Sequence, residues 1–184
     1  MKQLIFITGN QRKFTSAQDI LTDYGIDIIQ NAMDTPEIQD EDISKVAEYS
    51  ARYASEQLNK PVIKVDVGFE IEALNGFPGP FSKHINKWLP PEKILKLMEN
   101  EKNRKAKFID VVAFCDLGKG PISFISETPG TISEKVEGEK GWGIDQIFIP
   151  KSFSRTLAFL TDKERKLVWN NSHWLELVKY LGGK

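Results

Sequence analysis

Short apolar runs alternate with amphipathic segments along the first part of the chain. Residues 3–8 form an apolar run typical of a buried strand, and residues 13–24 carry apolar side chains at helical spacing. Residues 26–29 have the pattern of a second strand, and residues 43–59 that of a second helix, which Pro61 ends. The order strand, helix, strand, helix predicts a sheet covered by helices.

The same patterns continue through the rest of the chain. Gly118 and Gly120 separate two apolar runs and indicate a hairpin between them. No internal repeat, low-complexity tract or linker interrupts the sequence, so we expect one domain over residues 1–184. The patterns predict strands at 62–67, 69–74, 106–116 and 122–126, and helices at 90–98 and 162–181.

Composition is that of an ordinary globular protein, with 184 residues of which 40% are hydrophobic and 28% charged. The net charge of −1 lacks the basic excess of nucleic-acid binders, so we expect no nucleic-acid partner. Cys115 is the one cysteine, which excludes a disulfide within the chain, and no Cys/His cluster indicates zinc. With no leader and no bilayer-length apolar run, we expect a cytoplasmic protein without a membrane partner.

A turn suited to phosphate follows the first predicted strand. Thr8, Gly9, Asn10 and Lys13 lie between that strand and the first helix. The N–H groups and the positive dipole end of a helix N-terminus hold phosphate, Gly9 permits close approach, and Lys13 adds charge. The segment lacks the P-loop pattern, GxxxxGK followed by Ser or Thr. A plain helix cap by Asn10 explains the same residues equally well.

Two carboxylates are candidates for holding a metal ion. Asp66 ends the apolar run 62–66, and a carboxylate after a buried strand points to the sheet edge where ligands of α/β proteins gather. Glu37 lies in a polar segment after Pro36. Mg²⁺ takes few protein ligands and keeps its waters, so two carboxylates suffice to hold it against phosphate oxygens. Taken alone, Glu37 is better explained as a solvated surface acid, whereas Asp66 is not.

Two further loops carry candidate ligand contacts. Trp142 stands between Gly141 and Gly143, which leaves its ring open for stacking on a base, and Asp145 can accept hydrogen bonds from a base edge. A stiff turn of Gly and Pro residues places Lys83 at the start of a helix. Taken alone, each loop fits a structural role: a turn with a core tryptophan, and a surface lysine.

In chain order these segments resemble the inosine triphosphate pyrophosphatase family. The similar stretches are TGNQRK at 8–13, PEIQ at 36–39, the long and specific EALNGFPGPFSK at 72–83, and GWGID at 141–145. The resemblance runs along nearly the whole chain, and the PEIQ segment is similar to archaeal and eukaryotic members. It implies hydrolysis of a nucleoside triphosphate (ITP, dITP or XTP) to monophosphate and pyrophosphate, which clears non-standard purines from the nucleotide pool.

The resemblance also implies a fold, a cofactor and an assembly. The fold would be an elongated α/β domain, with a central mixed sheet flanked by helices and two lobes around a nucleotide cleft. Mg²⁺, with Mn²⁺ as an alternative, would support attack by water on the α-phosphate. The protein would be a homodimer whose other partner is the small-molecule nucleoside triphosphate.

Residue roles carry over from the family by position. Asp66 would be the catalytic carboxylate that orients or deprotonates the water, and it would share the metal with Glu37. The substrate-binding residues would be Thr8, Gly9, Asn10 and Lys13 for the triphosphate, Lys83 for the nucleotide, Trp142 and Gly143 for stacking on the purine, and Asp145 for the base edge.

The chain departs from the family pattern near these residues. Val65 and Val67 stand where the family has an acid and a hydroxyl, a loss that would lower metal affinity. Ser50 lies near the place where the family often has a phosphate-facing lysine. Gln146 replaces a proline, which loosens the loop that carries Trp142.

The family's C-terminal base-recognition triplet, Ser-His-Arg, is altered further. It falls on residues 169–171, which are Trp-Asn-Asn, and a Ser-His pair follows three residues later at 172–173. Asn170 and His173 are therefore candidates for bonding a base edge, and Arg165 for a charge near the phosphates. His173 is explained equally well as a surface histidine of the terminal helix.

Three hypotheses follow from the sequence. The leading one is a working pyrophosphatase. The second is a divergent relative that binds nucleotide with slow hydrolysis or altered base preference, favoured by the departures above. The third is a non-enzymatic interaction module of the same fold, disfavoured by the retained carboxylates and the charge balance.

Overall fold

The computed structural model describes residues 2–183, which form two compact units. Unit 1 comprises Met1–Asp66, Asp110–Ser126 and Asn171–Lys184, and unit 2 comprises Val67–Ile109 and Glu127–Asn170. Three strands contribute residues to both units, and each unit has its own core.

Unit 1 is built on parallel strand pairing. The strand β1 (Lys2–Ile7) pairs in parallel with β2 (Ile26–Asn31) on one side and with the start of β3 (Val62–Ile71) on the other. Residues of β5 (Lys105–Cys115) and β6 (Ile122–Ile132) complete the order β2-β1-β3-β5-β6. The connections β1 to β2 and β2 to β3 each contain a helix, as parallel neighbours require.

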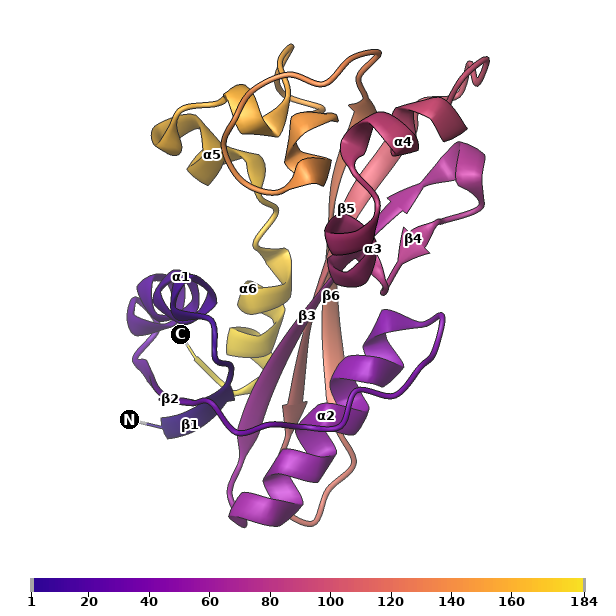
Figure 1. Cartoon of the computed structure of the whole chain (residues 1–184). Helices are drawn as coiled ribbons and strands as arrows, with labels where there is room; N and C mark the ends of the chain where they lie inside the picture. Colours follow the sequence, from indigo (N-terminus) through magenta and orange to yellow (C-terminus); the bar gives the residue numbers. More distant parts are fainter. Residues whose placement is uncertain (1, 184) are drawn as a thin grey trace. The chain divides into compact units, whose positions relative to one another are not determined.

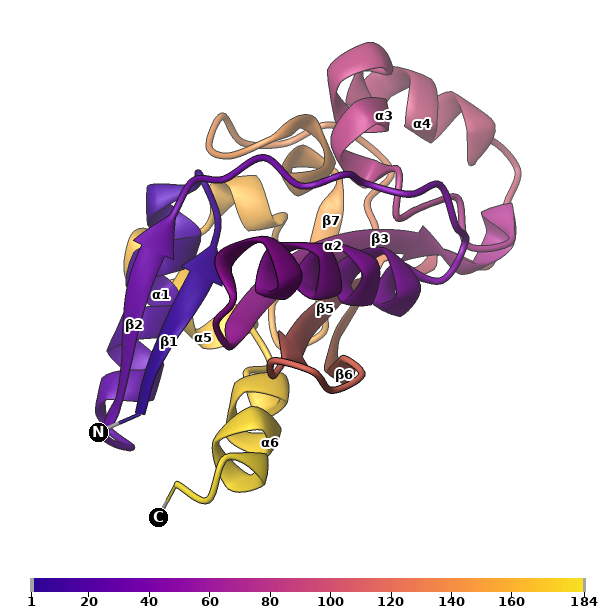
Figure 2. The same cartoon turned by 90° about the horizontal axis from the view of Figure 1, so that it is seen from below.

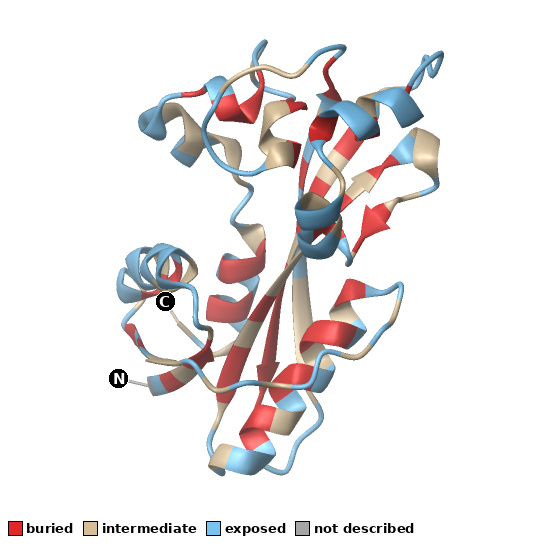
Figure 3. Cartoon of the chain, in the orientation of Figure 1, coloured by how far each residue is buried: buried red, intermediate tan, exposed pale blue. Residues whose placement is uncertain are grey.

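The helices of unit 1 are α1 (Gln11–Thr22), α2 (Ile43–Leu58) and α6 (Ser172–Tyr180). α1 lies against β1 and β2 and contacts α6, and α2 runs along β3 (Figures 1 and 2). The Phe6 ring of β1 meets the Trp174 ring of α6 edge to face, with centroids 6.0 Å apart. Buried residues follow β3, β5 and one side of α2 in Figure 3, which marks the core of this unit.

Unit 2 contains the remaining parts of the same strands and adds antiparallel pairing to β3 and β6. Two short strands lie at its edges: β4 (Pro78–Gly79) pairs with β3, and β7 (Phe148–Pro150) pairs with β6. Its helices are α3 (Ser82–Trp88), α4 (Pro91–Leu97) and α5 (Asp162–Val168), with short 3₁₀ turns η1 (Glu72–Leu74), η2 (Gly143–Gln146) and η3 (Leu157–Phe159).

Three aromatic rings form the centre of the unit 2 core. The Phe69 ring centroid lies 4.7 Å from that of Phe108 and 5.5 Å from that of Phe148. Gly130 on β6 is required beside them, since a Cβ there would lie 2.3 Å from the Ile149 carbonyl oxygen. Strand pairing and ring packing therefore fix this core together.

The α/β class and the mixed sheet flanked by helices are confirmed, with corrections to individual elements. The two strands expected at 62–67 and 69–74 are one strand, β3, followed by η1. β6 is longer than expected, and the short strand β7 was not predicted. Within the described residues, no helix combines the length and apolarity needed to cross a membrane.

The single terminal helix expected at 162–181 is wrong. α5 ends at Val168, Trp169 takes an extended conformation (φ −78°, ψ 132°), and α6 begins at Ser172. Tertiary contacts override the helical spacing: the Trp169 ring packs 5.4 Å from the Phe108 ring, and the Asn170 side chain donates to the Glu127 carbonyl. The break falls where the chain passes from unit 2 to unit 1.

Candidate functional site

The turn between β1 and α1 is held by its own polar groups. The Asn10 Oδ1 accepts from the backbone N–H of Arg12 at 2.9 Å and of Lys13 at 3.3 Å, so Asn10 caps α1. The Thr8 hydroxyl accepts from the Asn10 N–H at 3.1 Å. No atom lies within 4 Å of the Cβ position of Gly9, so the backbone is open to a ligand there.

Lys13 connects this turn to the strand that carries Asp66. Its half-buried side chain places the Nζ atom 3.4 Å from the Val65 carbonyl oxygen, to which it donates. Because Val65 directly precedes Asp66, Lys13 contacts the backbone of β3 next to the residue with which the sequence predicts it to share a site. The shared site itself stays a prediction.

The loop that carries Glu37 is fixed from two elements of unit 1. The buried Ser50 hydroxyl of α2 donates to the Pro36 carbonyl at 3.0 Å. The Lys64 ammonium of β3 donates to the Thr35 hydroxyl at 3.1 Å. Ser50, noted in the sequence only as a missing lysine, therefore anchors the segment on which the exposed Glu37 sits.

Lys64 and Asp66 share one face of β3 because side chains two apart on a strand point the same way. Asp66 is half-buried, and its Oδ2 atom is hidden from solvent. Sequence reasoning overlooked Lys64, whose role shows only through its contact with Thr35.

A magnesium site with two carboxylates fits this donor set. Among residues 2–183, no group of three or more His, Cys, Asp or Glu side chains is placed to hold a metal ion. Mg²⁺ commonly uses one or two carboxylates and takes the rest of its shell from water and substrate phosphates. Glu37 and Asp66 carry oxygen ligands of this kind, and their joint binding of a metal ion stays a prediction.

A third acid of unit 1 was missed in the sequence. Asp110 on β5 is half-buried, and burial raises its pKa to about 6, with the Lys13 ammonium acting in the opposite direction. The available signal was an acid inside an apolar run, between Ile109 and Val111.

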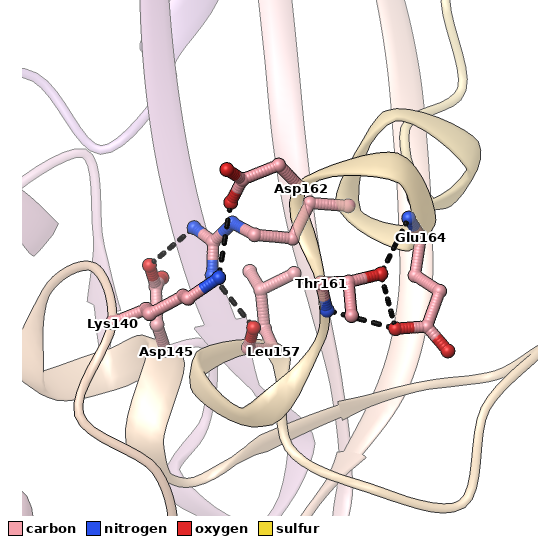
Figure 4. Close-up of polar contacts among 7 residues, drawn as sticks. Lys140, Asp145, Leu157, Thr161, Asp162 and Glu164 are labelled. Atoms are coloured by element: carbon pink, nitrogen blue, oxygen red, sulfur yellow. Dashed lines mark hydrogen bonds and ion pairs between the residues drawn. The ribbon is translucent and has the colours of Figure 1, made fainter.

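In unit 2 a part-buried ion pair holds the loop around Trp142. The Asp145 Oδ2 accepts from the Arg165 Nη2 at 2.9 Å (Figure 4). The same oxygen accepts from the Trp142 N–H at 3.2 Å. The Arg165 Nη1 also donates to the Leu157 carbonyl at 2.6 Å. Asp145 and Arg165 thus bind each other in this structure, and their contact with a substrate stays a prediction.

Gly141 is required at this loop. Its φ is +81°, and a Cβ atom would lie 1.8 Å from the Asp145 Oδ2. The Ile144 N–H donates to the Asn86 side chain at 3.0 Å, which ties the turn at Gly143 to α3. With the turn held at both ends, Trp142 is 55% exposed and its ring is accessible, so the expectation of a core tryptophan is wrong.

The other three residues predicted to contact the substrate differ from one another in exposure and in hydrogen bonding. Lys83 is exposed at the start of α3. Asn170 is exposed, and its backbone N–H donates to the Thr128 hydroxyl at 3.2 Å. His173 is 4% exposed, with its Nδ1 2.5 Å from the Ser126 hydroxyl, so the reading as a surface histidine is wrong. Its burial leaves little of the ring for a ligand.

These observations define a class of protein. A helix-capped turn follows the parallel strand β1, and the lysine of that turn donates to the backbone of β3, in the part of an α/β sheet where such proteins bind phosphorylated ligands. The chain belongs to the Ham1 family, whose family model matches residues 4–175. The resemblance seen in the sequence is thereby confirmed.

Two curated relatives and one solved structure support the same family assignment. The chain is 44% identical over 174 residues to the "dITP/XTP pyrophosphatase" of Methanopyrus kandleri, covering 95% of this chain and 93% of that protein. It is 40% identical to the protein of the same name in Methanosarcina mazei, over the full length of both. The structure of a HAM1 protein from Coxiella burnetii has a TM-score of 0.84 at 27% identity and covers 98% of each chain.

Proposed function

We propose that this protein hydrolyses dITP, ITP and XTP to the nucleoside monophosphate and pyrophosphate. One observation carries the proposal: Lys13, from the phosphate-binding turn, reaches the backbone of β3 directly beside Asp66. A cation held against a strand beside one of its carboxylates suits a polyphosphate and the water that attacks it. The curated relatives described above bear the corresponding name.

In the proposed reaction, water attacks the α-phosphorus and the bond from that phosphorus to the bridging oxygen breaks. Asp66 orients the water and takes its proton, while Lys13 and the N–H groups after Thr8 neutralise the triphosphate. Glu37 and Asp66 would hold Mg²⁺ or Mn²⁺, which supplies further charge neutralisation at the phosphates. Pyrophosphate leaves with the electrons of the broken bond.

Within unit 2, the residues predicted to contact a purine lie around one exposed ring. The exposed Trp142 ring offers a stacking face for a purine, held in place by Asp145 and Arg165. Lys83 adds a charge from the start of α3. In this arrangement Asp145 fixes the loop, and its remaining acceptor capacity is directed to the base edge.

Measuring pyrophosphate release tests the proposal. Purified protein is given dITP, ITP, XTP, GTP and dATP, with and without Mg²⁺. We expect metal-dependent release, fastest with dITP, ITP or XTP. Nucleotide-induced thermal stabilisation without release favours a divergent binder, which Val65 and the buried His173 make the second candidate. Absence of both responses leaves a non-enzymatic module.

We further propose that the protein is a cytoplasmic homodimer. A pocket of about 920 Å³ lies on unit 2 and is lined by both acids and lysines, including Glu70, Glu72, Lys105 and Lys107. A surface with both charge signs suits the self-complementary contact of a twofold dimer. Thr131→Arg, which places a bulky cation at this pocket, should turn a dimer into a monomer in light scattering. A wild-type monomer at micromolar concentration contradicts the assembly.

A further inference from the structure

The turn that carries Trp142 is joined to α3 by one side chain. The Ile144 N–H of η2 donates to the Asn86 Oδ1 at 3.0 Å, in a part-buried hydrogen bond. Because a backbone N–H can only donate, Asn86 must offer its amide oxygen at this place. A single acceptor on α3 therefore holds the backbone of the turn.

The turn also approaches α3 and the start of α4 closely at Gly143. A Cβ atom on this residue would lie 3.1 Å from the Asn86 Oδ1 and 3.2 Å from the Pro91 Cδ, tighter than most Cβ contacts. Glycine lets the backbone come this near to both helices. The hydrogen bond of Asn86 thus acts on a turn that already lies against the helix.

The backbone of the turn decides where the Trp142 ring stands. The ring belongs to a residue that is 55% exposed, so packing does little to fix it. Two side-chain oxygens from other positions hold the backbone instead: the Asp145 Oδ2 accepts from the Trp142 N–H, and the Asn86 Oδ1 accepts from the Ile144 N–H. Loss of either acceptor gives the ring more freedom.

α3 is itself fixed to the sheet and carries a second predicted nucleotide contact. The Ser82 hydroxyl, on a residue 9% exposed, donates to the Val67 carbonyl of β3 at 3.2 Å. Lys83 follows Ser82 and lies three residues before Asn86, and residues three apart are neighbours on a helix surface. One anchored helix therefore carries Lys83 and holds the turn of Trp142.

We propose that Asn86 is a positioning residue of the base-binding subsite, because its side-chain oxygen holds the Trp142 turn against the helix that carries Lys83. The inference rests on the proposed function, which gives Trp142 a purine as its ligand. A stacking ring held in advance loses less freedom when the base binds, and preorganised sites gain affinity in this way. Asn86 acts through the turn and does not touch the nucleotide.

Three substitutions separate the oxygen of Asn86 from its bulk. Asn86→Ala and Asn86→Leu both remove the acceptor, and both residues suit a helix, so folding does not depend on one variant alone. Asn86→Asp keeps an acceptor oxygen and should restore wild-type behaviour. Asn103→Leu is the matched control, because the Asn103 Oδ1 also accepts from a backbone N–H of unit 2, that of Lys105.

Hydrogen exchange at the Ile144 amide tests the anchor without any need for activity. We expect exchange about 10-fold faster in Asn86→Ala and Asn86→Leu, because the amide loses its partner, and a wild-type rate in Asn86→Asp and Asn103→Leu. Amide exchange is followed by NMR, and circular dichroism checks the fold of each variant. An unchanged rate in the two variants that lack the oxygen overturns the proposal.

Kinetics with two ligands test the role in base binding. Inorganic tripolyphosphate has no base, so as a competitive inhibitor it reports on the triphosphate contacts alone. We expect Asn86→Ala to raise KM for dITP about 5- to 10-fold, with kcat within about 2-fold of wild type and an unchanged inhibition constant for tripolyphosphate. Asn86→Asp should return KM to the wild-type value. An equal rise in KM and in the inhibition constant shows a general disturbance and overturns the positioning role.

The two proposals fail in different ways. If the wild-type protein releases no pyrophosphate from any nucleoside triphosphate, the proposed function is wrong, and hydrogen exchange still decides whether Asn86 holds the turn. If release is normal and KM for dITP is the same in Asn86→Ala as in wild type, the enzyme stands and the positioning role falls.

Discussion

At the scale of the residue, two carboxylates of unit 1 stand in different surroundings. Asp66 hides one oxygen from solvent beside Val65, whose carbonyl accepts the Lys13 ammonium. Asp110 lies in an apolar strand that raises its pKa. The first has an oxygen withdrawn from water, and the second binds its proton more tightly than a free carboxyl group does.

Asp66→Asn should abolish turnover while leaving the fold intact. The amide keeps the size of the side chain but has neither the charge to bind a metal nor the basicity to take a proton, so we expect kcat to fall about 10³-fold or more. Pyrophosphate release and urea unfolding check the two halves of this prediction. Asp116→Asn serves as the control and should keep wild-type turnover. Near-normal rates in Asp66→Asn would show that another residue activates the water.

Asp110→Asn should make the protein more stable at neutral pH. The folded-state pKa of about 6 lies above the ordinary value of 3.8, so the folded state binds the proton more tightly and stability falls as pH rises from about 4 to about 6. The shift of about 2 units corresponds to at most about 3 kcal/mol, which the half-buried position reduces to about 1–2 kcal/mol.

Urea unfolding at pH 4.5 and pH 7.5 measures this dependence. The wild-type protein should lose stability between the two values relative to Asp110→Asn, with the difference between the proteins larger at pH 7.5. If the stability difference between the two proteins were equal at both pH values, the pKa of Asp110 would be the same in the folded and the unfolded chain.

Sequence patterns located part of this site and overlooked the rest for a physical reason. Thr8, Asn10 and Lys13 lie in one short segment at a strand-to-helix junction, where the backbone itself defines the chemistry. Lys64 and Asp110 interact with residues of other segments: Lys64 donates to the Thr35 hydroxyl, and the Lys13 ammonium lowers the pKa of Asp110. Linear spacing does not reveal such pairs until the strand order is known.

At the scale of the element, buried hydroxyl groups tie segments to helix α2. Ser50 donates to the Pro36 carbonyl and holds the loop of Glu37, while Ser55 on the same helix donates to the Lys60 carbonyl at its end. Both serine residues are buried, at 0–1% exposed, so they form a matched pair of hydroxyl groups that differ in the segment each one holds.

Ser50→Ala should weaken metal use, whereas Ser55→Ala should not. Each substitution removes the hydroxyl donor of a part-buried hydrogen bond, so we expect each to lower the free energy of unfolding by about 1 kcal/mol. Only Ser50→Ala frees the loop of Glu37, and it should raise the Mg²⁺ concentration for half-maximal activity about 3- to 10-fold. A similar rise in both variants would point to general destabilisation.

Gly141→Ala should disrupt the loop that presents Trp142. The new Cβ collides with Asp145 and the backbone has φ +81°, so we expect a loss of about 1–3 kcal/mol in stability and a higher KM for dITP. Gly120→Ala is the control, because no atom lies within 4 Å of its Cβ position. Equal KM values in both variants would separate this loop from nucleotide binding.

At one helix boundary, the spacing of apolar residues fails to predict the structure. The apolar spacing of residues 162–181 continues through the break between α5 and α6, and Leu167, which a continuous helix would bury, is 77% exposed. The break exists because Trp169 packs on Phe108, a contact between residues far apart in sequence. β1, α1, β2 and α2 were predictable because each short segment carries its own periodicity and ends at its own cap or turn.

At the scale of the whole molecule, β3, β5 and β6 supply residues to both units. A strand that loses its order in one unit loses the pairing that continues into the other. This continuity predicts that the chain unfolds in one cooperative transition.

Two tryptophans report on the two units. Trp174 lies in unit 1 and Trp169 in unit 2, so variants that keep one of them, with the other three tryptophans changed to Phe, follow each unit by fluorescence. We expect the same urea midpoint from both variants and from circular dichroism. Separate midpoints would show that the units unfold independently.

The same interleaving has a consequence for synthesis on the ribosome. The phosphate turn and Asp66 emerge early, yet Trp174 and Leu177, both in the core of unit 1, lie in the last helix of the chain. While residues 171–184 are still in the exit tunnel, the Phe6 side of the sheet lacks its cover. The nascent protein thus exposes an apolar surface until α6 has left the tunnel, and chaperones that bind such surfaces have their opportunity in that interval.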